Sequence, residues 1–307
     1  MITHPTIKGS GVAIITPFDA KGNVDEVSLR RLVNHLADGG IDVLVALGTT
    51  GESVTLTKDE KRRVQEIVLD ENAGRCSVML GIGGNNTNEV AENLQHADLH
   101  GIEAVLSVAP YYNKPNQEGH FQHYKIIAEA SPKPLMLYNV PGRTGVNMSA
   151  ETTLRIAHEC QNVCGIKEAS GNMEQIMQII RQRPNGFLVI SGDDALTFPL
   201  IACGADGVIS VVANAYPALF SEMVHRSMDG DFLAARPIHL ALLEFTRLMF
   251  ADGSPAGIKA ALKLLNICDE FVRLPLVTVR ADIYQAIEKE MQHLKHIHIQ
   301  SSSKKLI

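Results

Sequence analysis

The segment Val43-Leu-Val-Ala-Leu-Gly-Thr-Thr-Gly-Glu-Ser-Val-Thr-Leu-Thr-Lys-Asp-Glu60 contains one strand–turn–helix unit. It opens with an uninterrupted apolar run over 43–47, which is typical of a parallel strand buried on both faces. Thr57 followed three residues later by Glu60 forms a capping box, which predicts that a helix begins there. This unit is the repeat from which we infer the fold.

Similar apolar runs recur along the chain, with helical patterns between them. The eight runs are 11–16, 43–47, 78–81, 104–108, 135–138, 164–167, 187–191 and 207–212. Eight strand–helix alternations predict an α/β fold, a closed (β/α)8 TIM barrel, and a doubly wound open sheet is the alternative.

The strand runs stop near residue 230. Helical patterns follow over 231–250, 256–268 and 279–297, and the chain ends in a polar, basic segment from Ser301. We therefore expect a barrel carrying the active site over 1–230 and a C-terminal helical appendage over 231–307, with a disordered tail.

Composition excludes several classes of function. Apolar residues make up 45% of the 307, and the net charge of −6 argues against a nucleic-acid partner. The sequence has neither a signal-peptide pattern nor an apolar run of membrane-spanning length, so we expect a cytoplasmic protein without membrane contact. The five cysteines are scattered and the C-terminal histidines lie at a helix end, so no metal site is predicted.

Catalytic groups of such barrels lie at the carboxyl ends of the strands. The run 164–167 ends in Lys167, where a lysine is costly unless its amine is paired or neutral. Burial favours the neutral amine, which is the form that attacks a keto carbon. An ion pair with Glu168 is the alternative, but adjacent strand residues point to opposite faces. We therefore expect Lys167 to be the nucleophile.

Other strand ends carry groups suited to a carboxylate ligand. The turn 48–53 offers backbone N–H groups and hydroxyls, as a carboxylate cradle does, and an ordinary capped turn is the alternative. Tyr138 ends its strand, so its hydroxyl points toward the barrel mouth. Arg143 offers a planar fork in a glycine-rich loop, where a surface ion pair is equally possible. For the aromatic loop 110–115, packing is the favoured interpretation from the residues alone.

Taken together, the segments 48–53, 138–145 and 165–171 closely resemble the dihydrodipicolinate synthase / N-acetylneuraminate lyase family. The segments 110–115, 191–194 and 207–211 extend the match. The resemblance implies a metal-independent aldolase mechanism: a lysine–pyruvate Schiff base loses a methyl proton, and the enamine attacks an aldehyde. Members with Gly-Thr-Thr-Gly-Glu at 48–52 and an arginine at the position of Arg143 join pyruvate to L-aspartate 4-semialdehyde, on the route to diaminopimelate and lysine.

The resemblance also implies roles for individual residues. Lys167 forms the Schiff base, Tyr138 lies over it and passes protons, and Thr49 relays protons to Tyr112, which reaches across from a neighbouring subunit. The substrate-binding residues that it implies are Thr50 for the pyruvate carboxylate, Arg143 for the semialdehyde carboxylate, Ile209 through its backbone carbonyl, and Gly192. The shared tyrosine implies a homo-oligomer, which we expect to be a tetramer built as a dimer of dimers, and no cofactor is expected.

A possible allosteric pocket is matched by Ser53, Asn85, Glu89 and Tyr111. Lysine-inhibited members carry histidines where this chain has Lys58 and Lys61. Because two cations would repel the ammonium group of the effector, we predict weak or absent inhibition by lysine.

Two alternatives remain at this stage. Another Schiff-base pyruvate aldolase or lyase, acting on a sugar acid such as N-acetylneuraminate, would share Lys167 and Tyr138, and only Arg143 and Thr49 argue against it. A catalytically inactive barrel that binds a sugar acid or regulates another protein is the third hypothesis.

Overall fold

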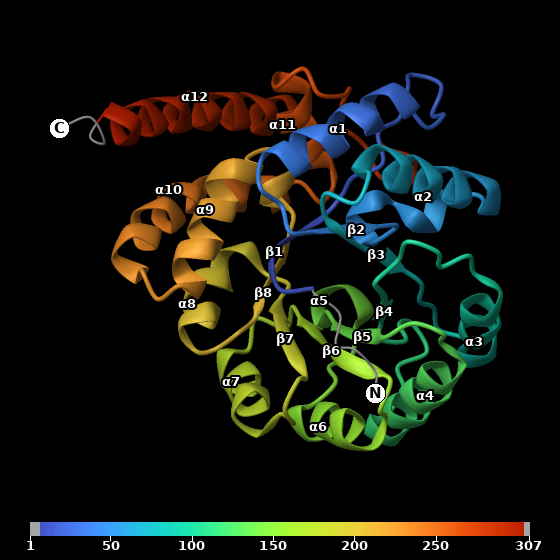
Figure 1. The fold of residues 1–307 in the computed structure, drawn as a ribbon. Helices are drawn as coiled ribbons and strands as arrows, with labels where there is room; N and C mark the ends of the chain where they lie inside the picture. Colours follow the sequence, from blue (N-terminus) through green and yellow to red (C-terminus); the bar gives the residue numbers. More distant parts are fainter. Residues whose placement is uncertain (1–6, 304–307) are drawn as a thin grey trace.

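The computed structural model describes residues 7–303, with side chains described for 7–295. Eight parallel strands close into a barrel in sequence order, which confirms the predicted (β/α)8 fold (Figure 1). The strands are β1 Gly9–Ala13, β2 Val43–Ala46, β3 Ser77–Gly81, β4 Ala104–Val108, β5 Leu135–Asn139, β6 Val163–Glu168, β7 Leu188–Ser191 and β8 Gly207–Ser210.

Successive side chains along each strand point alternately into the barrel and toward the helices, which divides the core into two parts. In β5, Met136 and Tyr138 belong to the buried cluster inside the barrel. Leu135 and Leu137 belong to the larger cluster between the barrel and the helices. Both faces are apolar, which is why the strands appear in the sequence as continuous rather than alternating runs.

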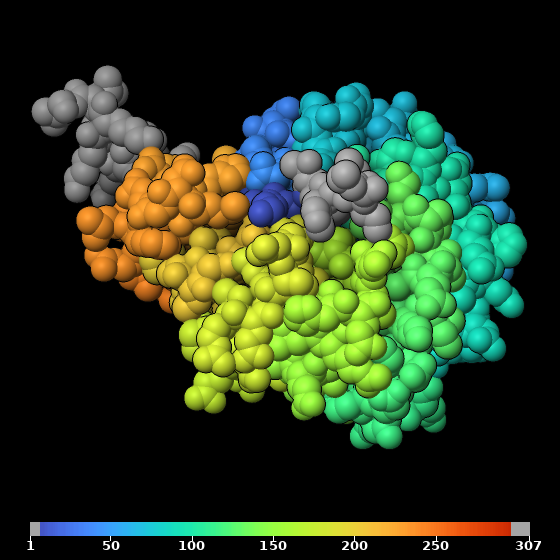
Figure 2. Space-filling view, turned by 60° about the horizontal axis from the view of Figure 1, so that its bottom comes forward, coloured from blue at the N-terminus to red at the C-terminus, as the bar shows by residue number. Residues whose placement is uncertain are grey.

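Helices cover the outside of the barrel, and α4, α6 and α7 pack side by side in the green-to-yellow part of Figure 2. The α-helices that precede the C-terminal region are α1 Glu26–Asp38, α2 Lys58–Asn72, α3 Thr87–His96, α4 Gln117–Ala130, α5 Pro141–Thr144, α6 Ala150–Glu159, α7 Met173–Gln182, α8 Thr197–Ala202 and α9 Pro217–Met228. The short 3-10 turns are η1 Thr49–Gly51, η2 Ser53–Thr55, η3 Asp194–Leu196 and η4 Val212–Asn214. Helix α2 begins at the predicted capping box, in which Thr57 and Glu60 exchange side-chain–backbone hydrogen bonds.

The C-terminal region is helical, as predicted, and lies beside α8 and α9 (Figure 1). It consists of α10 Phe232–Phe250, α11 Ala256–Leu264 and α12 Ala281–Ser303. Ile287, Met291 and Leu294 form the buried stripe of α12. The helix continues to Ser303 where a disordered tail was expected from Ser301, and 304–307 lie outside the described residues.

One strand is displaced from its predicted position. The first run was predicted at 11–16, but β1 is Gly9–Ala13, and Ile14 and Ile15 lie in the loop that follows it. Both isoleucines are buried in the barrel–helix cluster, and an apolar run alone does not separate a buried strand from a buried loop. Among residues 7–303, no helix combines the length and the apolar character needed to cross a membrane.

Candidate active site

Lys167 and Tyr138 lie opposite each other at the carboxyl ends of β6 and β5, where they are register partners. The Lys167 Nζ atom is 4.4 Å from the centre of the Tyr138 ring, and both side chains are buried. Glu168 points to the other face of β6, as predicted, and its carboxylate accepts hydrogen bonds from Asn139 and Gln175 instead. The structure therefore presents a buried amine beside a phenol at the barrel mouth.

Gly192 keeps space free beside the lysine. A Cβ atom at residue 192 would lie 3.0 Å from Lys167 Cε and 2.7 Å from Ala169 Cβ. Strand β8, which pairs with β7, contributes Ile209, and this side chain is buried inside the barrel. The segment after Ile209 is fixed by Asp194, whose carboxylate accepts hydrogen bonds from the Ser210 hydroxyl and the Val211 N–H.

The predicted cradle is folded as two 3-10 turns, η1 and η2. Thr50 is buried, whereas Thr49 is exposed in the single chain. The turn is attached to the loop after β1, because the Thr16 hydroxyl donates to the Gly51 carbonyl at 2.7 Å. Thr50 is thereby placed at the carboxyl end of β2, on the same edge of the barrel as Lys167.

Two loops that carry predicted site residues lie together at the barrel mouth. Arg143 is exposed in α5, and the Lys114 side chain lies close to Gly145 at the end of that helix. Tyr112 is 87% exposed and adopts a left-handed backbone with φ of 71°. A large aromatic side chain held in this conformation and open to solvent is unusual for an isolated subunit.

The predicted allosteric residues are brought together only in part. The Asn85 side chain donates to the Tyr111 carbonyl at 3.2 Å, which joins the loops after β3 and β4. Glu89 lies exposed in the first turn of α3, and Ser53 opens η2. Lys58 occupies the first turn of α2, one turn ahead of Lys61.

The sequence did not predict a hydrogen-bonded pair on the outer face of β5 and β6. Asn139 and Glu168 are also register partners, and Asn139 Nδ2 lies 3.1 and 3.2 Å from the two carboxylate oxygens. Burial raises the pKa of Glu168, and these donors oppose the shift. Burial likewise raises the pKa of Asp194 to about 6. The only signal in the sequence for Asn139 and Glu168 was that each directly follows a predicted strand.

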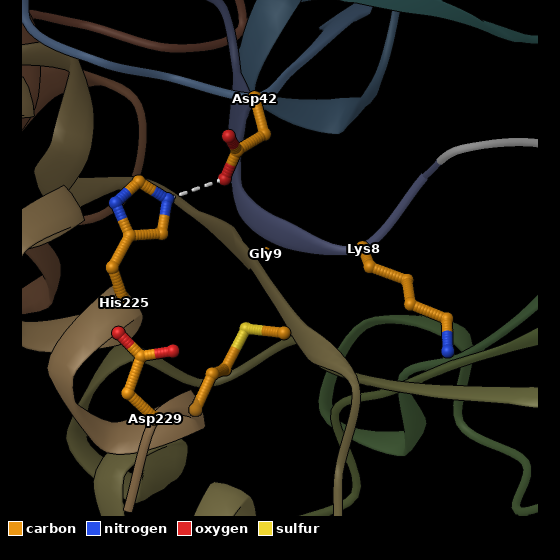
Figure 3. Close-up of a pocket in the computed structure, with 6 residues that line it drawn as sticks. Lys8, Gly9, Asp42, His225 and Asp229 are labelled. Carbon is orange, nitrogen blue, oxygen red and sulfur yellow. Dashed lines mark hydrogen bonds and ion pairs between the residues drawn. The ribbon is translucent and has the colours of Figure 1, made fainter. Parts of the chain in front are cut away.

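A separate pocket of about 350 Å³ opens at the amino-terminal end of the strands (Figure 3). His225 from α9 points at Asp42, and its Nε2 atom lies 2.7 Å from the Asp42 carboxylate. That carboxylate also accepts the Ser10 N–H, and its hydrogen bond raises the pKa of His225. Because groups at this end of a barrel serve stability rather than chemistry, we assign the pocket no catalytic role.

The fold and the site define a (β/α)8-barrel enzyme with a buried lysine near the carboxyl end of its sixth strand. A sequence model of the dihydrodipicolinate synthetase family matches residues 6–294. The chain therefore belongs to this family.

Individual relatives cover most of this chain. The 4-hydroxy-tetrahydrodipicolinate synthase of Parabacteroides distasonis is 51% identical over 94% of this chain and 97% of its own length. The crystal structure of dihydrodipicolinate synthase from Aquifex aeolicus superposes with a TM-score of 0.90 at 38% identity, covering 94% of this chain and 98% of that one. A structure described as a monomeric dihydrodipicolinate synthase variant also matches with a TM-score of 0.90 at 38% identity, covering 93% and 96%.

Proposed function

We propose that this chain joins pyruvate to L-aspartate 4-semialdehyde through a Schiff base on Lys167. The product is 4-hydroxy-tetrahydrodipicolinate, a precursor of diaminopimelate and lysine. The observation that carries the proposal is the buried Lys167 amine held 4.4 Å from the Tyr138 ring. The family and its 4-hydroxy-tetrahydrodipicolinate synthase relatives supply the choice of reaction.

The chemistry follows from the amine. The Lys167 nitrogen adds to the keto carbon of pyruvate, and loss of water gives an imine. Loss of a methyl proton converts the imine to an enamine, whose carbon forms the new bond to the aldehyde carbon while the aldehyde oxygen takes up a proton. The amino group of the semialdehyde then displaces the Lys167 nitrogen from the imine carbon, which closes the ring and frees the lysine. Tyr138 is suited to move these protons because its phenol ring lies 4.4 Å from the Lys167 amine at the carboxyl end of β5.

Binding of the two carboxylates completes the proposal. Thr50 holds the pyruvate carboxylate with its hydroxyl and backbone N–H, in the space left by Gly192 and beside the Ile209 carbonyl. Arg143 binds the carboxylate of the semialdehyde, and its exposure at the entrance supports this role.

The proposed proton relay needs a second subunit. Thr49 and Tyr112 are both exposed in the single chain, and Val54 beside the cradle is 85% exposed. We propose that these loops pack against a second copy and that two such dimers form a homotetramer. Light scattering on the purified protein tests this, and a monomer that is fully active would contradict it. The cytoplasmic location expected from the sequence stays a prediction.

Reduction with borohydride in the presence of pyruvate tests the chemistry. The wild-type protein should gain a stable adduct on Lys167, detected as a mass increase that is absent from Lys167→Ala. Turnover with the semialdehyde, compared with N-acetylmannosamine at equal concentration, tests the substrate. Preference for the sugar aldehyde would retain Lys167 as nucleophile but identify a sugar-acid lyase.

A further inference from the structure

Glu52 ends the Gly-Thr-Thr-Gly-Glu motif, and the proposed chemistry gives it no role. Its side chain is only 1% exposed, which is rare for a carboxylate unless it is paired. It separates η1 from η2 and adopts a left-handed backbone with φ of 52°. A non-glycine residue keeps such a conformation only where its surroundings hold it there.

The groups that hold Glu52 come from the C-terminal helical region. Lys259 of α11 is fully buried, and its Nζ atom lies 2.5 Å from Glu52 Oε1. The Arg273 backbone N–H donates to Glu52 Oε2 at 2.9 Å. Lys259 also donates to the Phe271 carbonyl at 2.8 Å. Because neither buried charge is stable without the other, each side chain fixes the position of its partner.

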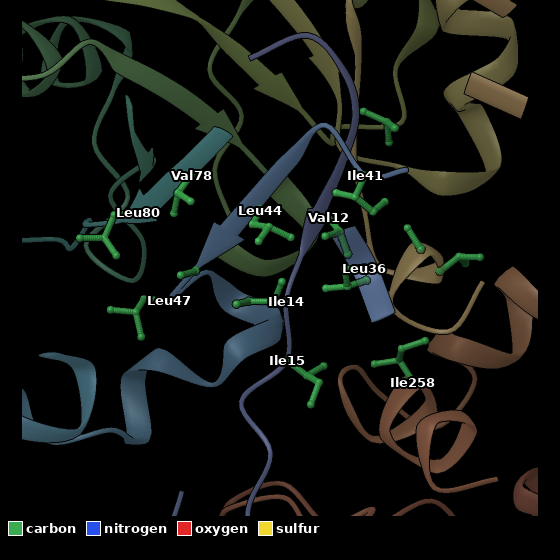
Figure 4. Packing of buried hydrophobic residues seen from close by; sticks show 14 of the residues in the cluster. Val12, Ile14, Ile15, Leu36, Ile41, Leu44, Leu47, Val78, Leu80 and Ile258 are labelled. Carbon is green, nitrogen blue, oxygen red and sulfur yellow. The ribbon is translucent and has the colours of Figure 1, made fainter. Parts of the chain in front are cut away.

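The same turn is held from the barrel side as well. Thr16 binds the Gly51 carbonyl, and a Cβ atom at Gly51 would lie 3.1 Å from the Ile14 carbonyl. Ile258, which precedes Lys259, belongs to the same buried cluster as Ile14 (Figure 4). The residues directly after Thr50 are thus clamped between the loop after β1 and helix α11.

We infer that Glu52 is a positioning residue, through which α11 sets the place of the threonine cradle and hence the affinity for pyruvate. This inference rests on the proposed pyruvate site. Thr50 would contact the pyruvate carboxylate, whereas Lys167 lies on β6 on another side of the barrel. Loosening the clamp should therefore weaken pyruvate binding more than it slows the chemistry at saturation.

The test compares substitutions on the two sides of the clamp. In Lys259→Met the KM for pyruvate should rise about tenfold or more, while kcat at saturating pyruvate changes by less than about threefold. Glu52→Gln keeps the shape of the side chain and an acceptor for the Arg273 N–H. It should raise the KM by a smaller factor. Glu60→Gln is the matched control, because it removes an ion pair with the Arg273 side chain but leaves Glu52 and Lys259 in place.

The borohydride adduct separates this inference from the proposed function. Absence of an adduct in the wild-type protein would overturn the proposed function. If the wild-type protein forms the adduct and Lys259→Met needs the same pyruvate concentration for half-maximal adduct formation, the positioning role alone would be overturned. If Lys259→Met lacks cooperative thermal unfolding, Glu52→Gln decides the question, and an unchanged pyruvate KM in that variant overturns the role.

Discussion

Glycine at residue 192 leaves space beside the side chain of Lys167, the proposed nucleophile. In Gly192→Ala the new methyl group would lie 3.0 Å from Lys167 Cε, closer than carbon atoms normally approach. We expect kcat/KM for pyruvate to fall at least about tenfold, because displacement of the amine by a fraction of an ångström disturbs its attack. Steady-state kinetics measure this. Gly142→Ala is the control, since a Cβ atom there meets nothing within 4 Å, and equal losses in both variants would refute the steric explanation.

Histidine burial on α4 makes stability depend on pH. Burial lowers the pKa of His123 to about 4, and its Nδ1 atom contacts the Thr87 hydroxyl at 2.9 Å. Histidine in the unfolded chain has a pKa near 6.5, so between about pH 6.5 and pH 4 the unfolded state binds more protons than the folded state. The free energy of unfolding therefore falls as the pH is lowered through this range. The resulting decrease in the free energy of unfolding should reach about 3 kcal/mol. His123→Gln should abolish this part of the pH dependence.

Urea unfolding of both proteins at pH 7.5 and pH 4.5 measures the difference. Asp194 acts with the opposite sign, because its folded-state pKa of about 6 lies above the unfolded value and favours the folded state as the pH falls. It is unchanged in the variant, so its contribution cancels when the two proteins are compared. Identical pH dependence of wild type and His123→Gln would contradict the role of His123.

Strands β5 and β6 carry the proposed catalytic pair on one face and a hydrogen-bonded polar pair on the other. Tyr138 and Lys167 pair inside the barrel, while Asn139 and Glu168 pair outside it. In Asn139→Ala the buried Glu168 carboxylate loses one of its two side-chain amide donors, which should lower the free energy of unfolding by about 2–3 kcal/mol. We expect kcat/KM to fall as well, because the ends of both strands are released.

Asn147, at the exposed end of the hydrogen-bond network around Glu168, supplies the control for Asn139→Ala. Asn147 donates to Gln175 and accepts from Asn139, but its side chain is open to solvent. Asn147→Ala should therefore cost less than about 1 kcal/mol, as exposed hydrogen bonds do. Chemical denaturation compares the two variants, and an equal loss in both would show that burial of Glu168 does not matter.

These strands also show what the sequence could and could not predict. Lys167 and Tyr138 were recognisable because each ends an apolar run with a reactive polar group. The pairing of Asn139 with Glu168 was not, because it depends on the register between two strands. The register between β5 and β6 shifts between Leu135 and Met136, and no feature of the sequence predicts this shift. The contact between Glu52 and Lys259 joins residues 207 positions apart, which no local pattern indicates.

At the scale of the whole molecule, regulation should differ from that of lysine-inhibited relatives. Lys58 and Lys61 lie in the opening turns of α2, close along the chain to Ser53 of the predicted allosteric pocket. Two cations there would repel the ammonium groups of free lysine. We expect millimolar lysine to leave turnover nearly unchanged in a steady-state assay. Half-inhibition at sub-millimolar lysine would show that the two side chains point away from the effector.

Whether Tyr112 serves its own subunit or a neighbour can be decided by mixing inactive variants. Lys167→Ala and Tyr112→Phe should each be nearly inactive alone. If Tyr112 acts across the interface, a hybrid dimer places the intact Lys167 of one subunit beside the intact Tyr112 of the other. Random reassembly should then restore about a quarter of the wild-type activity, because half of the dimers are hybrids with one complete site each.

The exposure of Tyr112 in the single chain favours this outcome. Subunits mixed without prior dissociation are the control and should stay inactive. If Tyr112 acted within its own subunit, every hybrid site would lack one of the two groups and mixing would restore nothing. Recovered activity would therefore show that the barrel needs a partner for catalysis and not only for stability.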